Sequence, residues 1–523
     1  MSGRHVVVIG AGLGGLSAAM RLSSAGFAVT VLERHSHAGG KMRTTASDAG
    51  PVDAGPTVLT MRYVFDALFT DAGTRLDDHV TLEREHHLAR HWWPDGAILD
   101  LFDDPAQSRD SVARAFGGRS AKEFEQFNAR MERLYSAFKE PMMEAAEPSQ
   151  IALTKHVLSN PSIIPDMAPL STLMASLKRQ FSDPRLAQLF GRYATYVGGS
   201  PFQSPALLGL IWRSEARGVW RVKGGMHKLA AAMQSCAEHT GATFQFNSHV
   251  ARIETQDNRA RGVVLDDGTR IRADTVVFNG DPAALQQHLL GPGPQHAVAI
   301  KSVTPRSLSA YVWSFAAKPK GADLAYHNVF FGADPEDEFG PLEAGKMPND
   351  PTLYICAQDR GGNAHPTGLE RFEIIMNGPP VAPGAQRPET ENDICRTRVF
   401  QTLQHYGLTF SPRPSAETLT TPHGFQTLFP GSAGSLYGRS PHGMMAAFAR
   451  PTARTRLKGL YLSGGGTHPG AGIPMATLSG QHAAEAIQRD HALTLTSRQT
   501  GTRGGMLTGS ATMASAPSRS SGS

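Results

Sequence analysis

Glycines near the amino end of the chain have the spacing of a phosphate-binding turn. Gly10, Gly12, Gly14 and Gly15 follow a short β-branched run and open a segment whose apolar residues recur at helical spacing. In such a turn the first glycine permits the tight bend, the second lets the backbone approach a pyrophosphate, and the third allows close packing of helix on strand. The amino end of the helix then presents free N–H groups to the phosphates. We therefore predict a dinucleotide site here.

An acidic residue closes the next predicted strand. Glu33 ends the apolar run 27–32, where a carboxylate accepts hydrogen bonds from an adenosine ribose. Glu33 argues against a dinucleotide that carries a 2′-phosphate on its ribose, although the adjacent Arg34 could accommodate this phosphate. The plain alternative is a structural glycine turn followed by a surface glutamate.

Two further segments carry glycines beside polar or basic residues. Gly39, Gly40 and Lys41 suit a second backbone approach to the phosphates. Near the carboxyl end, a buried strand is predicted at 459–463, and the glycine-rich run 464–472 follows it. A proline then suits the first turn of a helix that reaches residue 488.

In this order the motifs resemble those of flavoproteins with two dinucleotide-binding domains, and residues 460–475 resemble the carotenoid desaturase (phytoene desaturase-like) family. The resemblance extends from Val6 to about Ile487. It implies FAD as the cofactor. The residues that the resemblance and the motifs assign to FAD are Gly10, Gly12, Gly14, Gly15, Glu33, Arg34, Gly40, Lys41, Val250, Gly466 and Met475.

Motifs in the middle of the chain are most like those of 1-hydroxycarotenoid 3,4-desaturases (methoxyneurosporene dehydrogenases). They lie at 327–331, 352–360, 430–438 and 475–480. The resemblance implies that a hydride leaves an allylic carbon for the flavin, the cation spreads along the polyene, and a neighbouring proton is lost. The product is an acyclic 1-hydroxycarotenoid with a new C3–C4 double bond. His468 is the candidate proton acceptor, and the alternative is that it only orders its loop.

The fold class that these motifs predict is α/β, a Rossmann-like FAD-binding domain with an inserted mixed α+β substrate domain. The pieces of the FAD-binding domain lie at the start, middle and end of the chain. The predicted segments are 1–75, 217–290 and 455–491 for FAD binding, 76–216 and 291–454 for the substrate, and 492–523 for a disordered tail.

A carotenoid substrate implies a narrow apolar tunnel with few charged groups. The methionine pairs at 142–143 and 444–445 could line it or belong to the core. A substrate hydroxyl needs one or two polar partners, which the sequence does not identify. Because such substrates dissolve in bilayers, an apolar surface must meet lipid. The candidate surface is 155–212, with apolar runs at 167–177 and 194–212, and ordinary core is the alternative.

The composition limits the class of protein to which the chain can belong. The chain has 523 residues, 40% of them hydrophobic and 19% charged, with a net charge of +5 and three widely spaced cysteines. These values argue against global disorder and a disulfide framework. We expect no secretory signal, no spanning helix, no metal and no nucleic-acid partner, and a cytoplasmic protein peripherally associated with the inner membrane. The histidines at 86, 87 and 91 are expected on a helix face rather than around a metal.

Three other functions remain open at this stage. A phytoene or neurosporene desaturase would share the same motifs. A non-catalytic lipid-binding protein of the related GDP-dissociation-inhibitor type would lack the intact Glu33 and the two glycine clusters. An amine oxidase tends to carry an acid near the ribityl chain, where this chain has Gly465. The electron acceptor is expected to be oxygen or a quinone.

Overall fold

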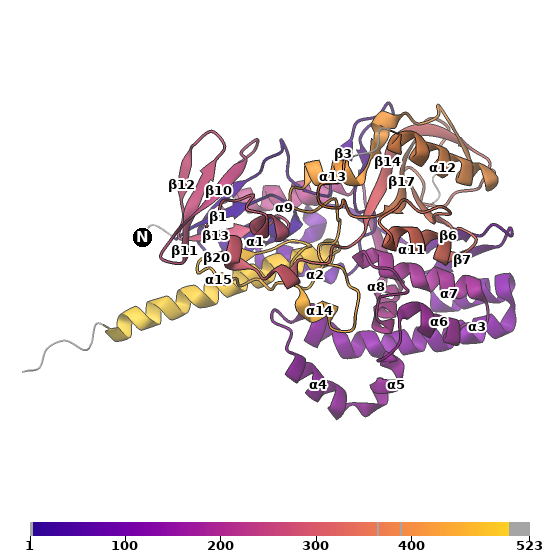
Figure 1. The fold of residues 1–523 in the computed structure, drawn as a ribbon, viewed down its shortest axis with the longest axis horizontal. Coiled ribbons are helices and arrows are strands. Elements are labelled where there is room, and N and C mark those ends of the chain that lie inside the picture. The colour runs from indigo at the N-terminus through magenta and orange to yellow at the C-terminus, as the bar shows by residue number, and fades with distance from the viewer. Residues whose placement is uncertain (1–3, 363–365, 387–389, 502–523) are drawn as a thin grey trace, which may run out of the picture.

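The computed structural model describes residues 4–362, 366–386 and 390–501, with side chains as far as residue 493. A parallel sheet with its covering helices forms one half of the molecule, and a mixed sheet with a layer of helices forms the other (Figure 1). The final helix, α15, extends outward from the first half. This arrangement confirms the α/β class and the Rossmann-like architecture.

A five-stranded parallel sheet forms the first half, in the order β20-β13-β1-β2-β9. Its continuous apolar strands suit a sheet that is covered on both faces. The strands are β1 (His5–Ile9), β2 (Ala28–Leu32), β9 (Thr243–Gln245), β13 (Thr275–Phe278) and β20 (Leu460–Leu462). They come from the start, middle and end of the chain, which brings the glycine clusters to one sheet.

Helices cover one face of this sheet, and a small antiparallel sheet packs near the other. The helices are α1 (Leu13–Ser24), α2 (Tyr63–Asp71), α9 (His227–His239) and α15 (Ile473–Gly501). The small sheet consists of β10 (Val250–Gln256), β11 (Arg259–Leu265) and β12 (Arg270–Arg272). β10 and β11 pair as an antiparallel hairpin, and α9 buries one face, with Leu229 and Met233 in the core.

The second half contains an eight-stranded mixed sheet in the order β18-β14-β17-β16-β15-β6-β7, with β19 paired to β14. On β17, alternation places Phe372, Ile374 and Met376 in the core. Ile375 and Asn377 therefore face the opposite side, toward the site. The strands are β6 (His87–Trp92), β7 (Ile98–Phe102), β14 (Ser309–Lys320), β15 (His327–Phe330), β16 (Leu353–Ala357), β17 (Glu370–Gly378), β18 (Thr409–Ser411) and β19 (Leu419–Thr420).

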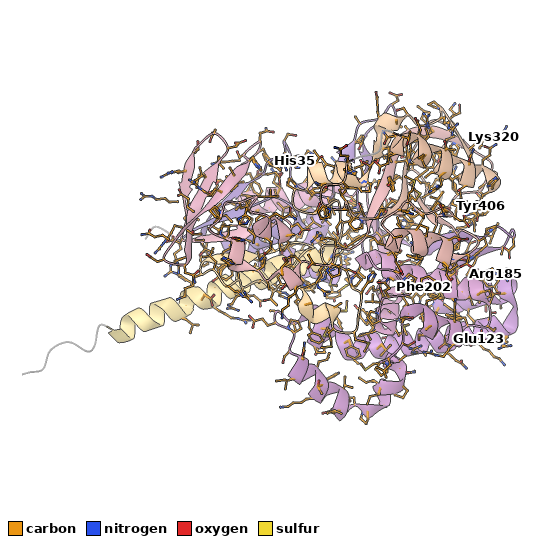
Figure 2. All side chains as sticks on the ribbon, viewed as in Figure 1. His35, Glu123, Arg185, Phe202, Lys320 and Tyr406 are labelled. Carbon is orange, nitrogen blue, oxygen red and sulfur yellow. The ribbon has the colours of Figure 1, made fainter. Side chains whose placement is uncertain are left out.

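A helical layer packs beneath this sheet around large aromatic side chains. Phe124, Phe127, Phe190 and Trp212 are nearly or fully buried in one cluster. Side chains of this layer, such as Glu123 and Arg185, lie on the outer side, well away from Lys320 on the mixed sheet (Figure 2). The helices are α3 (Pro105–Phe138), α6 (Leu173–Gln180), α7 (Pro184–Gly191) and α8 (Ile211–Ala216), with the helical turns η2 (Lys139–Glu144), η4 (Arg192–Val197) and η5 (Ala206–Leu210).

An arm formed by α4 (Gln150–Ser159) and α5 (Ile164–Met167) projects from the helical layer (Figure 1). The remaining elements are distributed over both halves. They are β3 (Thr44–Thr45), β4 (Val52–Asp53), β5 (Leu82–Glu85), β8 (Val219–Val222), α10 (Ala283–Gln286), α11 (Pro335–Glu343), α12 (Glu391–His405), α13 (Pro422–Leu428), α14 (Ala446–Ala449), η1 (Leu76–Asp78), η3 (Pro161–Ile163), η6 (Gln295–Ala297), η7 (Ile300–Ser302) and η8 (Ala416–Thr418).

Two sequence-based expectations are wrong in detail. The histidines at 86–91 lie beside and within strand β6, because β6 pairs with both β7 and β15 and tertiary pairing decides such short runs. The helix α15 continues to Gly501, beyond the tail boundary expected at 492, since neither glycine nor proline occurs between 492 and 500 to end it. The rest of the expected tail, 502–523, lies outside the described residues.

Candidate active site

The first and last glycine clusters are in direct contact. A Cβ added at Gly14 would lie 2.4 Å from the backbone nitrogen of Gly464 and 2.7 Å from Oδ1 of Asn279. A Cβ added at Gly480 would lie 2.2 Å from the carbonyl oxygen of Gly14. Side chains do not fit at these positions, so α1, α15 and the loop after β20 approach each other through bare backbone. We call this region the glycine cradle, formed by 10–15, 39–40 and 464–466.

The second glycine pair completes the cradle. Gly39 donates its N–H to the carbonyl oxygen of Ala11 at 2.8 Å, and a Cβ on Gly40 would lie 3.1 Å from the Cα of Gly12. Gly40 has a φ of +59°, a region that favours glycine. The three stretches singled out from the sequence therefore meet at the carboxyl ends of the parallel strands, where open α/β sheets bind ligands.

Glu33 lies at this edge as expected. Its carboxylate accepts hydrogen bonds from the N–H groups of Ala11 at 2.8 Å and His35 at 2.9 Å, and the residue is only 4% exposed. Arg34 beside it is exposed. Val250 begins β10 and is buried in the core that covers the sheet.

Asn279 is a residue of the site that the sequence reasoning missed. Its Nδ2 donates to the carbonyl oxygen of Gly10 at 3.1 Å, and its Oδ1 accepts from the Ser463 hydroxyl at 3.2 Å. Ser479 accepts from the N–H of Gly464 at 2.7 Å. Asn279 therefore links the two glycine loops. The available signal was its position directly after the apolar run that forms β13.

Cationic side chains gather beside the cradle. Lys41 donates to the carbonyl oxygen of Leu436, and Arg450 donates to that of Gly465 at 3.1 Å. Burial lowers the pKa of Lys41 to about 8 and that of Arg450 to about 10, because the charged forms lose hydration. Carbonyl oxygens and the nearby carboxylate of Asp281 offset this loss only in part, so the site favours a bound anion. Arg450 was not among the residues identified from sequence.

The carboxyl-terminal loop lies between the cradle and a large cavity. A Cβ on Gly466 would lie 2.6 Å from Cδ of Pro282, and Met475 lines the cavity from the first turn of α15. His468 also lines the cavity and is 3% exposed, and its Nε2 lies 2.7 Å from the carbonyl oxygen of Ala145. Because a carbonyl only accepts, Nε2 carries a proton. Burial lowers the pKa of His468 to about 4, which leaves the ring neutral at pH 7.

The cavity has a volume of about 560 Å³ and mostly apolar walls. It runs from the cradle side, at 468–475 and 55–58, to the base of the arm. The methionine pairs at 142–143 and 444–445 both line it, so the lining interpretation of these pairs is confirmed. Apolar side chains from the helical layer and the arm include Leu153, Met167, Leu207, Leu208 and Ile211.

Within the segment 155–212 that was expected to face lipid, most of the run 194–212 and most of the run 167–177 are buried or half-buried instead. Leu173, Met174 and Trp212 are buried in the helical-layer core, because helix packing has already covered their apolar faces. Exposed apolar side chains occur in the first part of that segment, at Leu158 (67% exposed), Ile164 (36%) and Leu170 (98%). Ile151 (72%) lies just upstream, and all four are on or around the arm.

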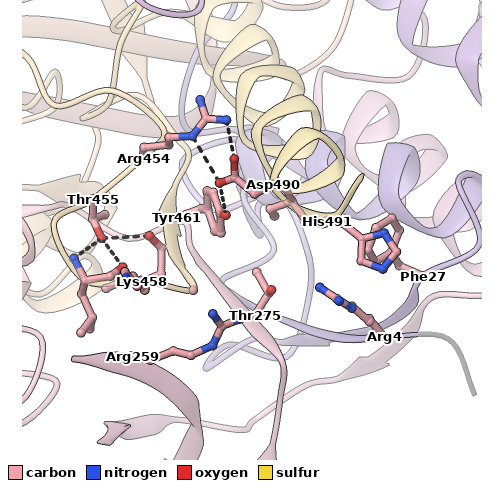
Figure 3. Close-up of a pocket in the computed structure, with 14 residues that line it drawn as sticks. Arg4, Phe27, Arg259, Thr275, Arg454, Thr455, Lys458, Tyr461, Asp490 and His491 are labelled. Atoms are coloured by element: carbon pink, nitrogen blue, oxygen red, sulfur yellow. Dashed lines mark hydrogen bonds and ion pairs between the residues drawn. The ribbon is translucent and has the colours of Figure 1, made fainter. Parts of the chain in front are cut away.

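A second pocket, of about 320 Å³, lies at the amino ends of the strands and is polar (Figure 3). Asp490 in it binds Arg454 at 2.9 Å and the hydroxyl of Tyr461 at 2.6 Å. This pocket lies at the opposite edge of the sheet from the glycines. Within the described residues there is no cluster of three or more His, Cys, Asp or Glu that could hold a metal, and no helix combines the length and apolarity that crossing a bilayer requires.

Residues 13–488 match the family described as flavin containing amine oxidoreductase. The chain is 55% identical over 485 residues to a hydroxyneurosporene desaturase of Cereibacter sphaeroides, covering 93% of this chain and 97% of that protein. It is 41% identical over 514 residues to the enzyme of the same name from Rubrivivax gelatinosus, covering 97% and 98%. A redesigned putrescine oxidase shares the fold, with a TM-score of 0.59 at 15% identity over 93% of this chain and 99% of that one.

Proposed function

The chain belongs to the flavin-containing amine oxidoreductases and, within them, to the carotenoid desaturases, and from this premise we propose that it introduces the C3–C4 double bond into acyclic 1-hydroxycarotenoids. FAD is the cofactor of this enzyme. The observation that carries the proposal is an apolar cavity of about 560 Å³ that adjoins the glycine cradle. A polyene chain requires such a cavity, whereas a small polar amine requires polar walls.

The residues present fit FAD. Gly10, Gly12, Gly14 and Gly15 would face the pyrophosphate together with Gly40 and Lys41, and Glu33 would face the ribose. Bare backbone at these positions leaves space that a Cβ would fill. When bound, FAD supplies the acceptor for two electrons and one proton of the substrate.

Around that group the chain positions the substrate and excludes water. The cavity walls desolvate a hydrocarbon chain and hold the bond to be oxidised against the loop 464–475. Arg34, Val250, Gly466 and Met475 complete the predicted FAD contacts. The bond from His468 Nε2 to Ala145 supports the ordering role, and any proton acceptance at His468 would fall to Nδ1, since Nε2 already carries a proton. Oxygen or a quinone would then reoxidise the flavin.

We also propose that the arm docks the enzyme onto the cytoplasmic membrane surface. Ile151 and Leu158 are separated by two helical turns and therefore share one face of α4. Leu153 and Val157, on another face, pack toward the body, and Leu153 reaches the cavity. Exposed apolar side chains at the base of an apolar cavity suit transfer of a carotenoid out of lipid.

The test is product analysis with the purified holoenzyme and two substrates presented side by side. With 1-hydroxyneurosporene we expect a red shift of the absorption bands, because the conjugated system lengthens by one double bond. Desaturation of only the non-hydroxylated chains would identify a phytoene or neurosporene desaturase instead. Peroxide release with amines and no carotenoid product would overturn the proposal altogether.

A further inference from the structure

The apolar cavity has polar side chains on two opposite walls, and the two walls differ in how well those groups are satisfied. On the sheet side, Thr352 and Asn377 donate to the two carboxylate oxygens of buried Glu338, at 2.6 Å and 2.8 Å. These donors are already used within the protein. They leave little reason for a ligand to bind there through hydrogen bonds.

On the helical side, Arg192 and Glu215 retain unmet hydrogen-bonding capacity. Arg192 donates through Nη2 to the hydroxyl of Tyr196 at 3.1 Å, but its Nε has no hydrogen-bond partner among the described residues. Glu215 is 5% exposed, and its Oε2 likewise has no hydrogen-bond partner in the described part of the chain. Both residues line the cavity. Burying such groups unsatisfied costs free energy, so their presence needs an explanation.

Burial dominates the electrostatics of this pair. It raises the pKa of the Glu215 carboxyl, while Arg192 and the hydroxyls of Tyr196 and Tyr193 lower it by less. Burial lowers the pKa of Arg192, but Tyr196, Tyr193 and Glu215 together raise it by more. Arg192 therefore stays a cation and a donor, and Glu215 stays an acceptor in either protonation state.

The segment that carries Arg192 leads toward the cradle. Arg192 begins η4, and Gly198, directly after η4, abuts the ring of Tyr437, where a Cβ would lie 2.5 Å from Cδ2. The next residue, Gly438, abuts the cradle, because its Cβ would lie 2.8 Å from the Cα of Gly466. Two short contacts thus connect the segment of Arg192 to the loop that would face the flavin.

A hydroxyl group donates one hydrogen bond and accepts others, which matches an acceptor and a donor that line the same cavity and interact electrostatically. We propose that Glu215 and Arg192 receive the terminal hydroxyl of the carotenoid, an inference that rests on the proposed function and names the groups that select the hydroxylated chain. The hydroxyl donates to Glu215 and accepts from Arg192. The hydrocarbon remainder extends through the apolar part of the cavity toward the arm.

This placement also sets which bond is oxidised. A hydroxyl on C1 lies only a few bonds from C3 and C4, so anchoring it near the cradle holds that bond beside the loop 464–475. A chain without the hydroxyl would leave the pair unsatisfied and would have no anchor for its register. Discrimination against it therefore follows from the unpaired polar groups.

The test compares the dissociation constants of 1-hydroxyneurosporene and neurosporene, both in the same detergent, for FAD-loaded wild type and variants, measured by quenching of protein fluorescence. We expect wild type to bind the hydroxylated chain about 10- to 100-fold more tightly. Glu215→Leu should abolish most of this preference, because it weakens the binding of the hydroxylated ligand only. Glu215→Gln should reduce the ratio less, because an amide still donates and accepts.

The matched control is Glu373→Gln. Glu373 is also a fully buried carboxyl, and neither of its oxygens has a hydrogen-bond partner among the described residues, but it is not part of the cavity lining. The Glu373→Gln variant should show the same ratio of the two dissociation constants as wild type. A ratio unchanged in both Glu215→Gln and Arg192→Gln, with flavin content preserved, overturns the inference even if Glu215→Leu fails to fold.

Turnover separates this inference from the proposed function. If wild type desaturates 1-hydroxyneurosporene but the Glu215 variants lose affinity for both ligands equally, the function stands and the hydroxyl subsite is wrong. If wild type produces no desaturated carotenoid, the proposed function fails, and the inference fails with it.

Discussion

The glycine cradle and the apolar cavity adjoin each other, but they are built on different principles. The cradle is backbone, and its tolerance for change is set by distances such as the 2.4 Å between a Cβ on Gly14 and the nitrogen of Gly464. The cavity is built of flexible side chains, among them seven methionines, from distant segments. Close backbone packing preserves one cofactor site, whereas side-chain walls can change to suit a substrate.

The same difference determines where charge is placed. The cradle holds Lys41 and Arg450 against carbonyl oxygens, a costly arrangement that a bound anion relieves. The cavity holds a poorly satisfied pair, Arg192 and Glu215, in mostly apolar walls. In each region we therefore expect the ligand to satisfy polar groups that the protein alone satisfies incompletely.

The largest expected effect comes from adding one methyl group to the cradle. Gly14→Ala places a Cβ within 3 Å of the Gly464 backbone, which cannot move without separating α1 from the final loop. We expect FAD affinity to fall about 100-fold or more, with a lower melting temperature, since overpacking costs roughly 1–3 kcal/mol or more. Flavin content after desalting and a thermal melt measure both effects.

Gly118→Ala is the matched control for that change. Gly118 lies in α3, is exposed, and would place its Cβ with nothing within 4 Å. Alanine favours helix over glycine by about 1 kcal/mol, so stability should stay equal or rise and FAD content should not change. Equal FAD affinity in Gly14→Ala and wild type would contradict the proposal that the glycine cradle binds FAD.

The extent to which the sequence predicted these regions follows from their construction. Gly10 to Gly15 and Glu33 form a local motif whose spacing reveals its geometry, so the parallel sheet and the glycine cradle were predictable. Asn279 and Arg450 were missed because each acts through a contact with a segment distant in sequence. Most of the apolar run 167–177 belongs to the core, because an apolar run does not reveal which partner covers it.

The second prediction concerns the cationic side of the cradle. Lys41→Met should weaken FAD binding but stabilise the apoprotein at neutral pH, because it removes a cation whose burial is unfavourable. The pKa falls from 10.5 unfolded to about 8 folded, which corresponds to at most about 3 kcal/mol. Urea denaturation of apo wild type and variant between pH 6 and pH 10.5 measures the difference.

The sign of the pH dependence can be stated in advance. Between pH 8 and 10.5 the unfolded chain binds more protons than the folded one, so the stability of wild type should rise with pH. The variant should lack this rise, and the gap between them should close toward pH 10.5. Exposed Lys228→Met is the control and should show no gap at any pH. A difference in stability that does not change with pH would mean that the lower stability of wild type does not come from the charge of Lys41.

The third prediction tests the outer end of the cavity. The triple change Ile151→Asp, Leu158→Asp and Leu170→Asp should reduce binding to lipid vesicles at least about 10-fold, because each exposed apolar side chain loses roughly 1 kcal/mol or more of burial in lipid. Turnover of detergent-dispersed substrate should be preserved. Vesicle co-sedimentation and the detergent assay separate docking from catalysis.

The control places aspartate at exposed apolar positions away from the arm. Ile300 (66% exposed), Ile394 (46%) and Leu289 (44%) are exposed apolar residues elsewhere in the fold. Replacing all three with aspartate adds the same charge as the arm variant and should leave vesicle binding unchanged. If both sets of changes reduce binding equally, net charge rather than the arm governs attachment.

The smallest expected effect is at His468, where the two regions meet. If His468 orders its loop through the bond to Ala145, glutamine can keep a donor there, and His468→Gln should retain kcat/KM within about threefold. A general base contributes about 100- to 10,000-fold, so a loss of that size would assign proton acceptance to His468.

The pH profile of kcat/KM is an independent test of the role of His468. With a pKa of about 4, a base at His468 would lower wild-type kcat/KM only as the pH falls toward 4. If His468 only orders its loop, the pH profiles of kcat/KM for wild type and His468→Gln should be parallel across that range.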